Sequence, residues 1–305
     1  MTFNKWLKLS LLIICTTRCA GGFTTVKVKV VDQDGLAIEG AEVFAGGQLG
    51  VDGENIKDLT DKEGVFRTIG RKNLAVVFRV NKEGYYQTKL RTNKNLQNLI
   101  IELRKKKKPT AMYAKTHILR FPKKQASIGF DFEQADWVAP YGKGSTAHIY
   151  FNLDGEYVDM WNHHSELNIT FPNSLDGIIE VSKNTSTSEF KFPYLAYSQS
   201  YKNSLVLKKS REGLESKRLL NYDESALGYI FRVNTEINSD GEIINANYGK
   251  ILGYINTSSQ VKKKSAGAIR FTYYYNPAPN DRSLEFDWRE NLFRDLEHEE
   301  KVYEP

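Results

Sequence analysis

The chain is divided into short runs of alternating apolar and polar residues, and glycines that follow acidic residues separate these runs. Val26, Val28 and Val30 alternate with lysines, and the run ends at Asp34-Gly35. Alternation with a period of two places the apolar side chains on one face of a strand. Glycine accepts the positive φ angles that tight turns require. The pattern predicts antiparallel strands joined by short turns.

Similar runs recur through residues 23–104. They lie at residues 41–44, 65–67, 74–80 and 99–103, and turns at Gly64 and Gly84 fall between them. Several short strands at regular spacing are typical of a β-sandwich. We therefore predict a β-sandwich domain over residues 23–104.

Three motifs in this region carry a resemblance to a known family. The stretch "VVDQDGLAIEGAEV", followed by "TDKEGVF" and "NKEGYY", resembles the carboxypeptidase regulatory-like domain, a transthyretin-like β-sandwich of secreted bacterial proteins. The resemblance covers residues 23–104 of 305, and the loop expected at residues 45–59 departs from the family pattern in its length. It implies an accessory module without catalytic residues, whose Asp34-Gly35 turn serves backbone geometry.

A second β-rich unit is predicted over residues 112–293. "AHIYFNLDGEYVDMW" predicts a hairpin that turns at Asp154-Gly155, and a longer hairpin is expected to turn at Asp240-Gly241. Residues 268–277 alternate in the same way. Helix is expected only at residues 211–220 and 291–300. The predicted class is all-β, with two sandwich-like domains in tandem, the second a sandwich or jelly-roll-like sheet.

The two units are separated by the run "RKKKKPT". Its five consecutive positive charges repel one another, and Pro109 prevents a strand from continuing, so residues 105–111 are predicted to form an exposed basic linker. Residues 294–305 are expected to form a charged tail. "PTAMYAK", "DWVAPYGKG" and "YNPAPNDRSLEFD" are similar to segments of uncharacterised bacterial secreted proteins, a similarity that implies no activity.

Residues 1–21 have the pattern of a signal peptide: Lys5 and Lys8, a short apolar core, and small residues at its end. Lipid attachment at Cys15 or Cys19 is disfavoured, because Ile14 and Arg18 precede these cysteines where a small residue is needed. We expect a secreted, periplasmic or cell-envelope protein. Its processed form would contain no cysteine, and therefore no disulfide or thiolate metal site.

The charge balance disfavours a nucleic-acid partner. The chain has 43 Lys and Arg against 37 Asp and Glu. The signal peptide contributes Lys5, Lys8 and Arg18 and no acidic residue, so its removal leaves 40 against 37, a net charge of +3. That weakly basic balance lacks the footprint of a nucleic-acid-binding domain.

Four residues form a weak candidate for a catalytic site. His163 and Glu166 have the His-x-x-Glu spacing of two zinc ligands in metallocarboxypeptidases, but a catalytic zinc needs a third ligand, and no other histidine lies in a comparable motif. Asp131 and Asp136 precede Trp137, as a glycosidase carboxylate pair near an aromatic residue would. Solvated side chains are the simpler interpretation, so we assign no catalytic residue, metal or cofactor.

A candidate binding loop is "NPAPNDRSLEFDW". Two prolines stiffen it, and it presents Asn280, Asp281 and Arg282 beside Phe286 and Trp288. The alternative is a rigid loop in which Arg282 pairs with Asp281 or Asp287. Predicted Asp-Gly turns at residues 32–35, 52–53 and 238–241 could hold calcium, but none is followed by the further oxygen ligands of an EF-hand loop.

These observations favour a non-catalytic binding or scaffolding protein whose partner is unknown. Envelope polysaccharide and another envelope protein are the candidate partners. The alternative is a secreted hydrolase of glycans or peptides, with the N-terminal sandwich as its accessory domain. An enzyme would require Asp131, Asp136, His163 or Glu166 to converge in a cleft.

Overall fold

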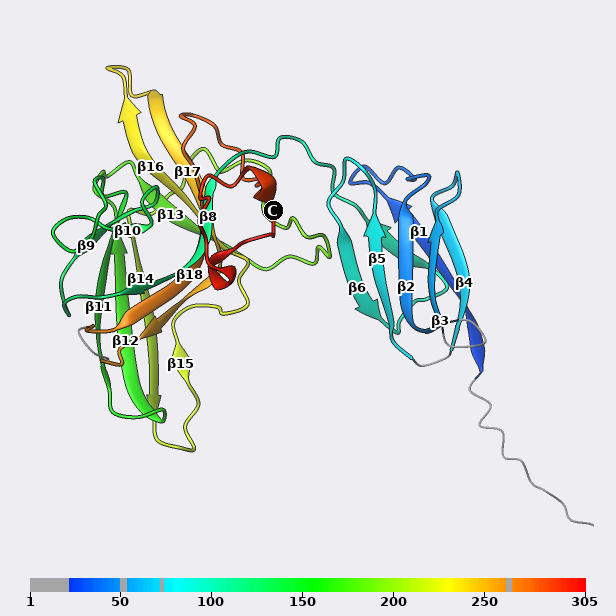
Figure 1. The fold of residues 1–305 in the computed structure, drawn as a ribbon, viewed down its shortest axis with the longest axis horizontal. Coiled ribbons are helices and arrows are strands. Elements are labelled where there is room, and N and C mark those ends of the chain that lie inside the picture. Colours follow the sequence, from blue (N-terminus) through cyan, green and yellow to red (C-terminus); the bar gives the residue numbers. More distant parts are fainter. Residues whose placement is uncertain (1–21, 50–53, 72–73, 262–264) are drawn as a thin grey trace, which may run out of the picture.

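The structure is a computed structural model that describes residues 22–49, 54–71, 74–261 and 265–305. The predicted signal peptide and the Asp52-Gly53 turn lie outside the described residues. The described chain is nearly all β and forms two sandwich-like parts (Figure 1), which confirms the predicted all-β class.

The first part contains seven strands in the hydrogen-bonded order β6-β5-β2-β4-β1-β7, with β3 paired to β2. β2 pairs with β3 and β5 along its first half and meets β4 only at its end, so it connects the two layers of the sandwich. The strands are β1 (Phe23–Val31), β2 (Glu42–Leu49), β3 (Glu54–Leu59), β4 (Val65–Arg71), β5 (Val76–Asn81), β6 (Thr88–Thr92) and β7 (Leu99–Glu102).

The alternation at the start of the chain produces the core of this sandwich. Val26, Val28 and Val30 of β1 are completely buried and belong to the same hydrophobic cluster as Val43 of β2 and Phe78 of β5. Burial of such side chains contributes about 1.5–3 kcal/mol each. The predicted strands at residues 41–44, 65–67, 74–80 and 99–103 are therefore confirmed.

The expected loop at residues 45–59 was wrong. β2 continues to Leu49 and β3 begins at Glu54, so the described residues of this segment lie almost entirely in two paired strands. The glycines in this segment suggest a loop. However, their backbone groups form hydrogen bonds with neighbouring strands, and such pairing does not depend on side chains.

The Asp34-Gly35 turn is closed by a nearby carboxylate. Asp32 Oδ1 accepts hydrogen bonds from the backbone N–H groups of Asp34 and Leu36, both at 2.9 Å. Gly35 has φ +78°, the left-handed region that favours glycine. The polar residues of this motif thus order the backbone of the turn.

The second part consists of two facing antiparallel sheets, with orders β10-β9-β11-β12-β14-β15 and β13-β16-β17-β18-β8. Its core is rich in aromatic rings. For example, the Phe130 ring of β9 makes edge-to-face contacts with the rings of Phe132, Trp137, Phe151 and Phe271. The strands are β8 (Tyr113–Arg120), β9 (Ile128–Asp131), β10 (Asp136–Trp137), β11 (Ile149–Tyr157), β12 (Asn162–Thr170), β13 (Gly177–Val181), β14 (Ser204–Glu212), β15 (Leu219–Leu220), β16 (Gly228–Ile237), β17 (Ile243–Ser258) and β18 (Ala268–Asn276).

The predicted hairpin turn at Asp154-Gly155 was wrong, whereas the turn at Asp240-Gly241 is confirmed. β11 continues through Asp154-Gly155 in unbroken register with β12 and ends only at Tyr157. A Cβ on Gly155 would lie 2.3 Å from the carbonyl oxygen of His164. This glycine therefore permits a close approach of two strands rather than a turn.

Neither segment expected to be helical forms an α-helix. Residues 211–220 include the end of β14 and all of β15. Within residues 291–300 the structure contains one short 3₁₀ helix, η2 (His298–Glu300); another, η1 (Trp288–Glu290), precedes this segment. The weak periodicity of both segments agrees with this outcome.

The outer face of the β17–β18 sheet is covered by non-strand segments. Residues 182–203 place Phe190 and Phe192 over it, and the C-terminal segment places Phe286 against Tyr274 of β18. Side chains on both faces of these strands are therefore buried, which explains why the consecutive residues Tyr273, Tyr274 and Tyr275 of β18 are all buried.

The basic run between the two parts is only partly an exposed linker. The side chains of Lys105–108 are exposed, as predicted, but Arg104 is only 9% exposed. Its guanidinium donates to the carbonyl oxygens of Phe190 and Phe192 and lies over the rings of Phe190 and Tyr194. These partners are distant in the sequence, and they keep Arg104 buried although the run of positive charges predicts that it is exposed to solvent.

Candidate functional site

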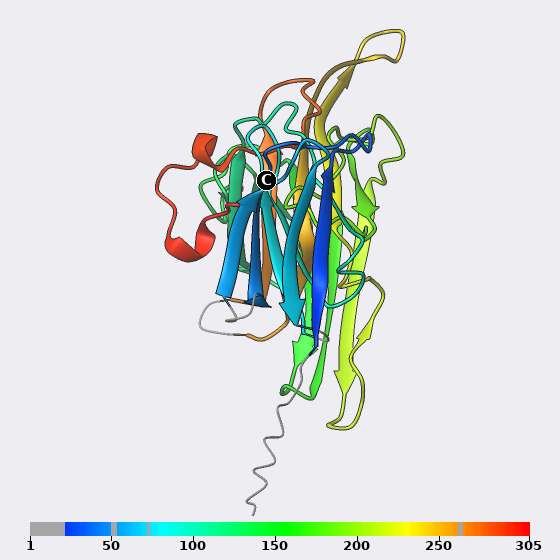
Figure 2. The same ribbon diagram turned by 90° about the vertical axis from the view of Figure 1, so that its right-hand side faces the viewer.

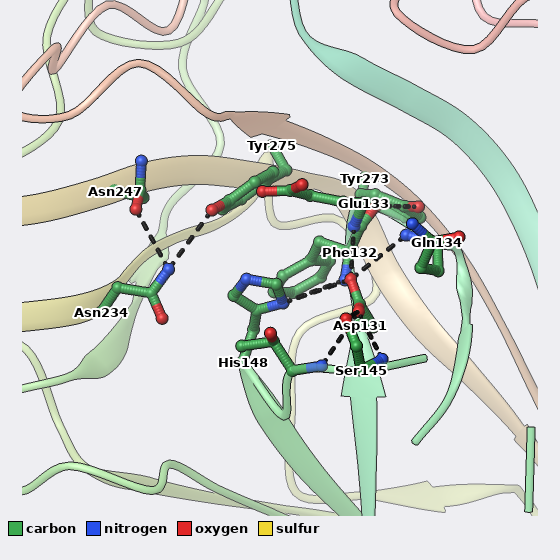
Figure 3. A network of polar contacts seen from close by, with 11 residues as sticks. Asp131, Phe132, Glu133, Gln134, Ser145, His148, Asn234, Asn247, Tyr273 and Tyr275 are labelled. Carbon is green, nitrogen blue, oxygen red and sulfur yellow. Dashed lines mark hydrogen bonds and ion pairs between the residues drawn. The ribbon is translucent and has the colours of Figure 1, made fainter. Parts of the chain in front are cut away.

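The Asp131 carboxylate, a candidate for catalysis, is used to order a loop (Figure 3). Asp131 is 2% exposed, and its oxygens accept hydrogen bonds from the backbone N–H groups of Glu133, Gln134, Ser145 and Thr146. Burial alone would raise the pKa of Asp131, but these donors hold it below its usual value. The carboxylate is thus saturated by the protein backbone.

Asp136 lies opposite Asp131 in the short β9–β10 ladder but has a similar role. Its two oxygens accept from the backbone N–H groups of Trp137 and Lys143, each at 2.8 Å. The two carboxylates therefore hold the same loop from two sides. Both carboxylates thus have a structural role in this loop.

Further hydrogen bonds beside Asp131 extend this structural network (Figure 3). The Tyr273 hydroxyl donates to the Phe132 carbonyl at 2.8 Å, and the backbone N–H of Phe132 donates to Nδ1 of His148 at 3.2 Å. Glu133 has a raised pKa because it is partly desolvated and lies near the charge of Asp131. The network orders the residues between β9 and β11.

The second predicted pair, His163 and Glu166, does not converge. The two residues differ by an odd number of positions along β12, so their side chains project from opposite faces of the sheet. His163 shares the face of Leu167, whereas Glu166 forms a 2.8 Å ion pair with Lys208 on the other face. Within the described residues, no group of three or more His, Cys, Asp or Glu side chains could hold a metal ion.

The predicted binding loop is largely committed to internal contacts. The Asn280 amide donates to the Ile244 carbonyl at 2.8 Å, and Asp281 accepts from Lys108 Nζ at 3.0 Å. The Arg282 guanidinium donates to the Ala196 carbonyl and not to the neighbouring carboxylates. The rigid-loop alternative is therefore closer to the structure, with distant partners in place of the expected local ones.

The last two residues of that loop differ in exposure. Phe286 is buried against Tyr274, whereas Trp288 is 47% exposed. The Trp288 ring lies 5.6 Å from that of Tyr303, centroid to centroid, and Tyr303 is 55% exposed. Of these two residues, Trp288 is the one available to a ligand.

Trp288 lies where the two sandwiches meet. Here Glu285, only 1% exposed, accepts hydrogen bonds from the Tyr86 hydroxyl and from the backbone N–H groups of Lys107 and Lys108. Burial, followed by the charge of Glu285, raises the pKa of Tyr86. A buried hydrogen-bonded carboxylate therefore connects the first sandwich, the crossing segment and the C-terminal segment.

Backbone pairing reinforces this junction. The N–H of Lys89 in β6 donates to the Thr187 carbonyl at 3.2 Å, and the N–H of Glu189 donates to the Gln87 carbonyl at 2.8 Å. A segment of the second part thus extends the edge of a sheet in the first. Main-chain pairing of this kind fixes the orientation of the two parts.

Two adjacent pockets lie at this junction, and we call them together the junction groove. Their volumes are about 210 Å³ and 460 Å³, and both are lined by Glu189, Tyr303 and Pro305. The smaller is also lined by Asn81, Tyr85, Gln87, Lys106, Asp287, Trp288 and Arg289. The larger adds Lys89, Lys191, Phe192 and Leu252, among others.

Sequence reasoning found Trp288 but missed most of the groove. Tyr85 lies in the "NKEGYY" motif, which predicts a turn and carries part of the family resemblance but indicates no ligand contact, and Tyr303 lies in the expected charged tail. An aromatic residue within an otherwise charged tail was the available signal for Tyr303. Nothing local in the sequence indicates that the two come together.

Comparisons with known proteins assign no family to this chain. No family model matches it, and no curated protein matches it. A DUF3823 family protein from Parabacteroides merdae is 9% identical with a TM-score of 0.22, over 83% of this chain and 98% of that one. A streptococcal ancillary pilin is 12% identical with a TM-score of 0.21, over 82% of this chain and 58% of that one.

A third solved structure, described as a "putative carbohydrate binding protein" from Bacteroides uniformis, is 8% identical with a TM-score of 0.19, over 84% of this chain and 98% of that one. At such identities and TM-scores these matches assign no function. A search of the described residues for a helix long and apolar enough to cross a membrane finds none.

Proposed function

We propose that this chain is an exported, non-catalytic binding protein that holds its ligand in the junction groove. The observation that carries the proposal is the groove itself, which both sandwiches build and in which Trp288 and Tyr303 are exposed beside polar side chains. A concave site with aromatic and convergent polar groups is the usual form of a ligand site. The predicted signal peptide supports export.

The lining of the groove favours an uncharged, hydroxyl-rich ligand such as an envelope oligosaccharide. Gln87 Nε2 donates to Asn81 Oδ1 at 2.6 Å, while the amide nitrogen of Asn81 and the amide oxygen of Gln87 make no hydrogen bond to the described residues. These groups could donate to and accept from sugar hydroxyls. Trp288 and Tyr303, each about half exposed, offer apolar aromatic surface for the sugar rings.

Charge in the smaller pocket is balanced, which argues against a polyanionic ligand. Lys106 and Arg289 face Asp287 and Glu189 around the same pocket. An excess of one sign would raise the local concentration of oppositely charged ligands, and no such excess exists here. We therefore expect binding that changes little with salt concentration.

The resemblance of the first sandwich to carboxypeptidase regulatory-like domains supports the same proposal. Such a domain would be an accessory module, and here it supplies Asn81, Tyr85 and Gln87 to the groove. We propose that it positions one wall of the site, with the second sandwich supplying the other.

The test measures retention of the purified protein on immobilised neutral polysaccharides, on sacculi and on membrane vesicles. Trp288→Ala and Tyr303→Ala should each weaken retention on polysaccharide by at least about tenfold, as truncation of a central aromatic contact does. Tyr141→Ala is the control, because Tyr141 is 45% exposed and does not line the groove. Equal retention of all three variants, or retention on vesicles alone, would contradict the proposal.

A further inference from the structure

Four polar side chains gather at the end of the second sandwich from which the β16–β17 hairpin projects (Figures 1 and 2). They are Glu133, which follows β9, His148, which precedes β11, Asn234 of β16 and Tyr275 of β18. Figure 3 shows their polar groups around one common space. None of the four lines the junction groove. We call these four residues the Glu133 site.

Tyr275 is the common neighbour of the other three residues. Its hydroxyl lies 3.4 Å from Asn234 Nδ2, and its ring centroid lies 5.0 Å from that of His148. The same hydroxyl lies near enough to Glu133 to offset part of the rise in the pKa of that carboxyl group. Tyr275 is itself only 1% exposed, so it holds the four residues in a fixed arrangement.

A bulge in β16 turns Asn234 towards this space. Val233 and Tyr275 both lie in the core, and in an unbroken strand the residue after Val233 would project from the opposite face of the sheet. The register of β16 shifts after Val233, and Asn234 has φ +56°, which few residues other than glycine adopt. The Asn234 amide therefore reaches Tyr275. Bulges that redirect a side chain in this way are common beside functional sites.

His148 presents a hydrogen-bond donor that has no partner among the described residues. Burial lowers the pKa of His148, which keeps the ring neutral, and the backbone N–H of Phe132 donates to its Nδ1. A neutral imidazole whose Nδ1 accepts carries its proton on Nε2. His148 is only 3% exposed, yet Nε2 donates to none of the described residues. Because buried donors are normally satisfied, a bound molecule must supply the acceptor.

Glu133 is a carboxylate without a counter-charge. It forms no ion pair with the described residues, and its pKa is raised because it is partly desolvated and lies near the charge of Asp131. Backbone N–H groups compensate Asp131, but Glu133 has only the Tyr275 hydroxyl beside it. A partly buried carboxylate is costly unless a cation pairs with it. The site therefore favours a positively charged group next to a hydrogen-bond acceptor.

We propose that the Glu133 site binds a small ligand that carries an ammonium group next to a hydroxyl, of which an amino sugar with a free amine is the simplest form. The ammonium group pairs with Glu133. The adjacent hydroxyl accepts from His148 Nε2 and donates to Asn234 Oδ1, which accepts no hydrogen bond from the described residues.

Other classes of ligand satisfy only part of this arrangement. A neutral sugar can accept from His148 but leaves Glu133 without a counter-charge. A simple anion can also accept from His148, but it meets the charges of Glu133 and Asp131. Within the described residues the structure has no cluster of acidic and histidine side chains that could hold a metal ion. An ammonium group beside a hydroxyl matches both polar ends of the site.

Isothermal titration calorimetry with three sugars that differ only at carbon 2 tests the role of charge. Glucosamine has an ammonium group there, glucose a hydroxyl and N-acetylglucosamine an uncharged acetamide. The wild-type protein should bind glucosamine at least about tenfold more tightly than either of the others, as expected for a hydrogen bond to a charged group. Equal affinities for the three sugars, or no measurable binding of glucosamine, would overturn the proposal.

Variants locate the ammonium group. Glu133→Gln keeps the shape of the side chain but removes its charge, and it should reduce the affinity for glucosamine to that for glucose. Glu236→Gln, an exposed carboxylate of β16 outside the site, is the matched control and should bind as the wild type does. Asn234→Gly accepts the positive φ and should weaken binding about fivefold through the lost amide. Unchanged far-UV circular dichroism and melting temperature verify that each variant folds.

Two further measurements separate the Glu133 site from the junction groove. Glucosamine should shift the nuclear magnetic resonance signals of the His148 imidazole in the wild-type protein, and Trp288→Ala should bind glucosamine normally. Unchanged affinity in Glu133→Gln would contradict the assigned site. Loss of glucosamine binding in Trp288→Ala, with the His148 signals unmoved, would place the amine in the junction groove and overturn the proposal.

Discussion

The Tyr86 hydroxyl donates a 2.9 Å hydrogen bond to the Glu285 carboxylate across 199 positions of the chain. Both residues are buried, and the same carboxylate accepts from the backbone of the segment that crosses between the sandwiches. One side chain of the C-terminal segment thus satisfies three donors, one from the first sandwich and two from the crossing segment. Because the junction groove lies beside this contact, its shape depends on Glu285.

We predict that Glu285→Ala lowers the free energy of unfolding by about 2–4 kcal/mol, because the variant leaves buried donors without an acceptor. Urea denaturation measures this directly. The matched control is Glu290→Ala, an exposed carboxylate in the same segment, which should change stability by less than about 0.5 kcal/mol. Equal effects of the two substitutions would show that Glu285 does not stabilise the junction.

Local patterns in the sequence were enough to predict strands with one apolar face. In β18, Ile269, Phe271, Tyr273 and Tyr275 alternate, and all four lie in the core as expected. This succeeds because a period of two specifies which side chains are buried, whatever the partner strand is. The class of the fold follows from the same local signal.

Partners far away in the sequence determined what local patterns missed. Asp154-Gly155 has the composition of a turn, but β12 pairs with both residues and keeps the strand extended. Arg104 is the first residue in a run of five cations, yet it is buried, and its guanidinium donates to the carbonyls of Phe190 and Phe192. Turn propensity and charge repulsion contribute less to the free energy of folding than a full set of backbone and side-chain hydrogen bonds.

The candidate site was harder to predict than the fold for the same reason. Asp131 and His163 belong to residue types that perform chemistry, but only their partners show that Asp131 caps a loop and that His163 faces away from Glu166. Tyr85 and Tyr303 have no local pattern that links them. A groove built by two domains is a property of their contact.

Two glycines in equivalent turns allow a separate test of backbone strain. Gly35 and Gly64 have φ +78° and +70°, but a Cβ on Gly35 meets nothing within 4 Å, whereas one on Gly64 would lie 2.6 Å from the Val30 carbonyl oxygen. Gly35→Ala should cost about 1–2 kcal/mol from the left-handed backbone alone. Gly64→Ala should cost clearly more, because it adds a clash with the backbone.

Thermal unfolding of both alanine variants beside the wild type provides the measurement. For a protein of this size, each kcal/mol corresponds to about 2–4 °C in melting temperature. Equal losses in the two variants would mean that the Val30 carbonyl moves aside without cost. A loss at Gly64 and none at Gly35 would contradict the assigned φ of the first turn.

A completely buried lysine beside the junction gives a prediction about pH. Lys250 of β17 donates to the Leu284 carbonyl at 2.6 Å and lies among the rings of Phe190, Phe192 and Tyr274. Burial lowers its pKa from 10.5 to about 7, and the charge of Glu285 offsets this only in part. The folded protein therefore releases this proton more readily than the unfolded chain.

The sign of the effect follows from proton binding. Between pH 7 and pH 10.5 the unfolded chain holds the Lys250 proton and the folded protein does not, so the contribution of Lys250 to stability rises with pH. Below pH 7 both states are protonated, and the folded state bears the full cost of a buried charge. A pKa shift of this size corresponds to about 5 kcal/mol.

We therefore expect Lys250→Met to stabilise the protein below pH 7 and to destabilise it near pH 10.5, where the neutral lysine still satisfies the Leu284 carbonyl. Losing that hydrogen bond should cost about 1–3 kcal/mol. Urea denaturation of both proteins across this pH range measures the difference. A difference in unfolding free energy that stays constant with pH would show that Lys250 keeps its proton in the folded state, held by Glu285 and the surrounding rings.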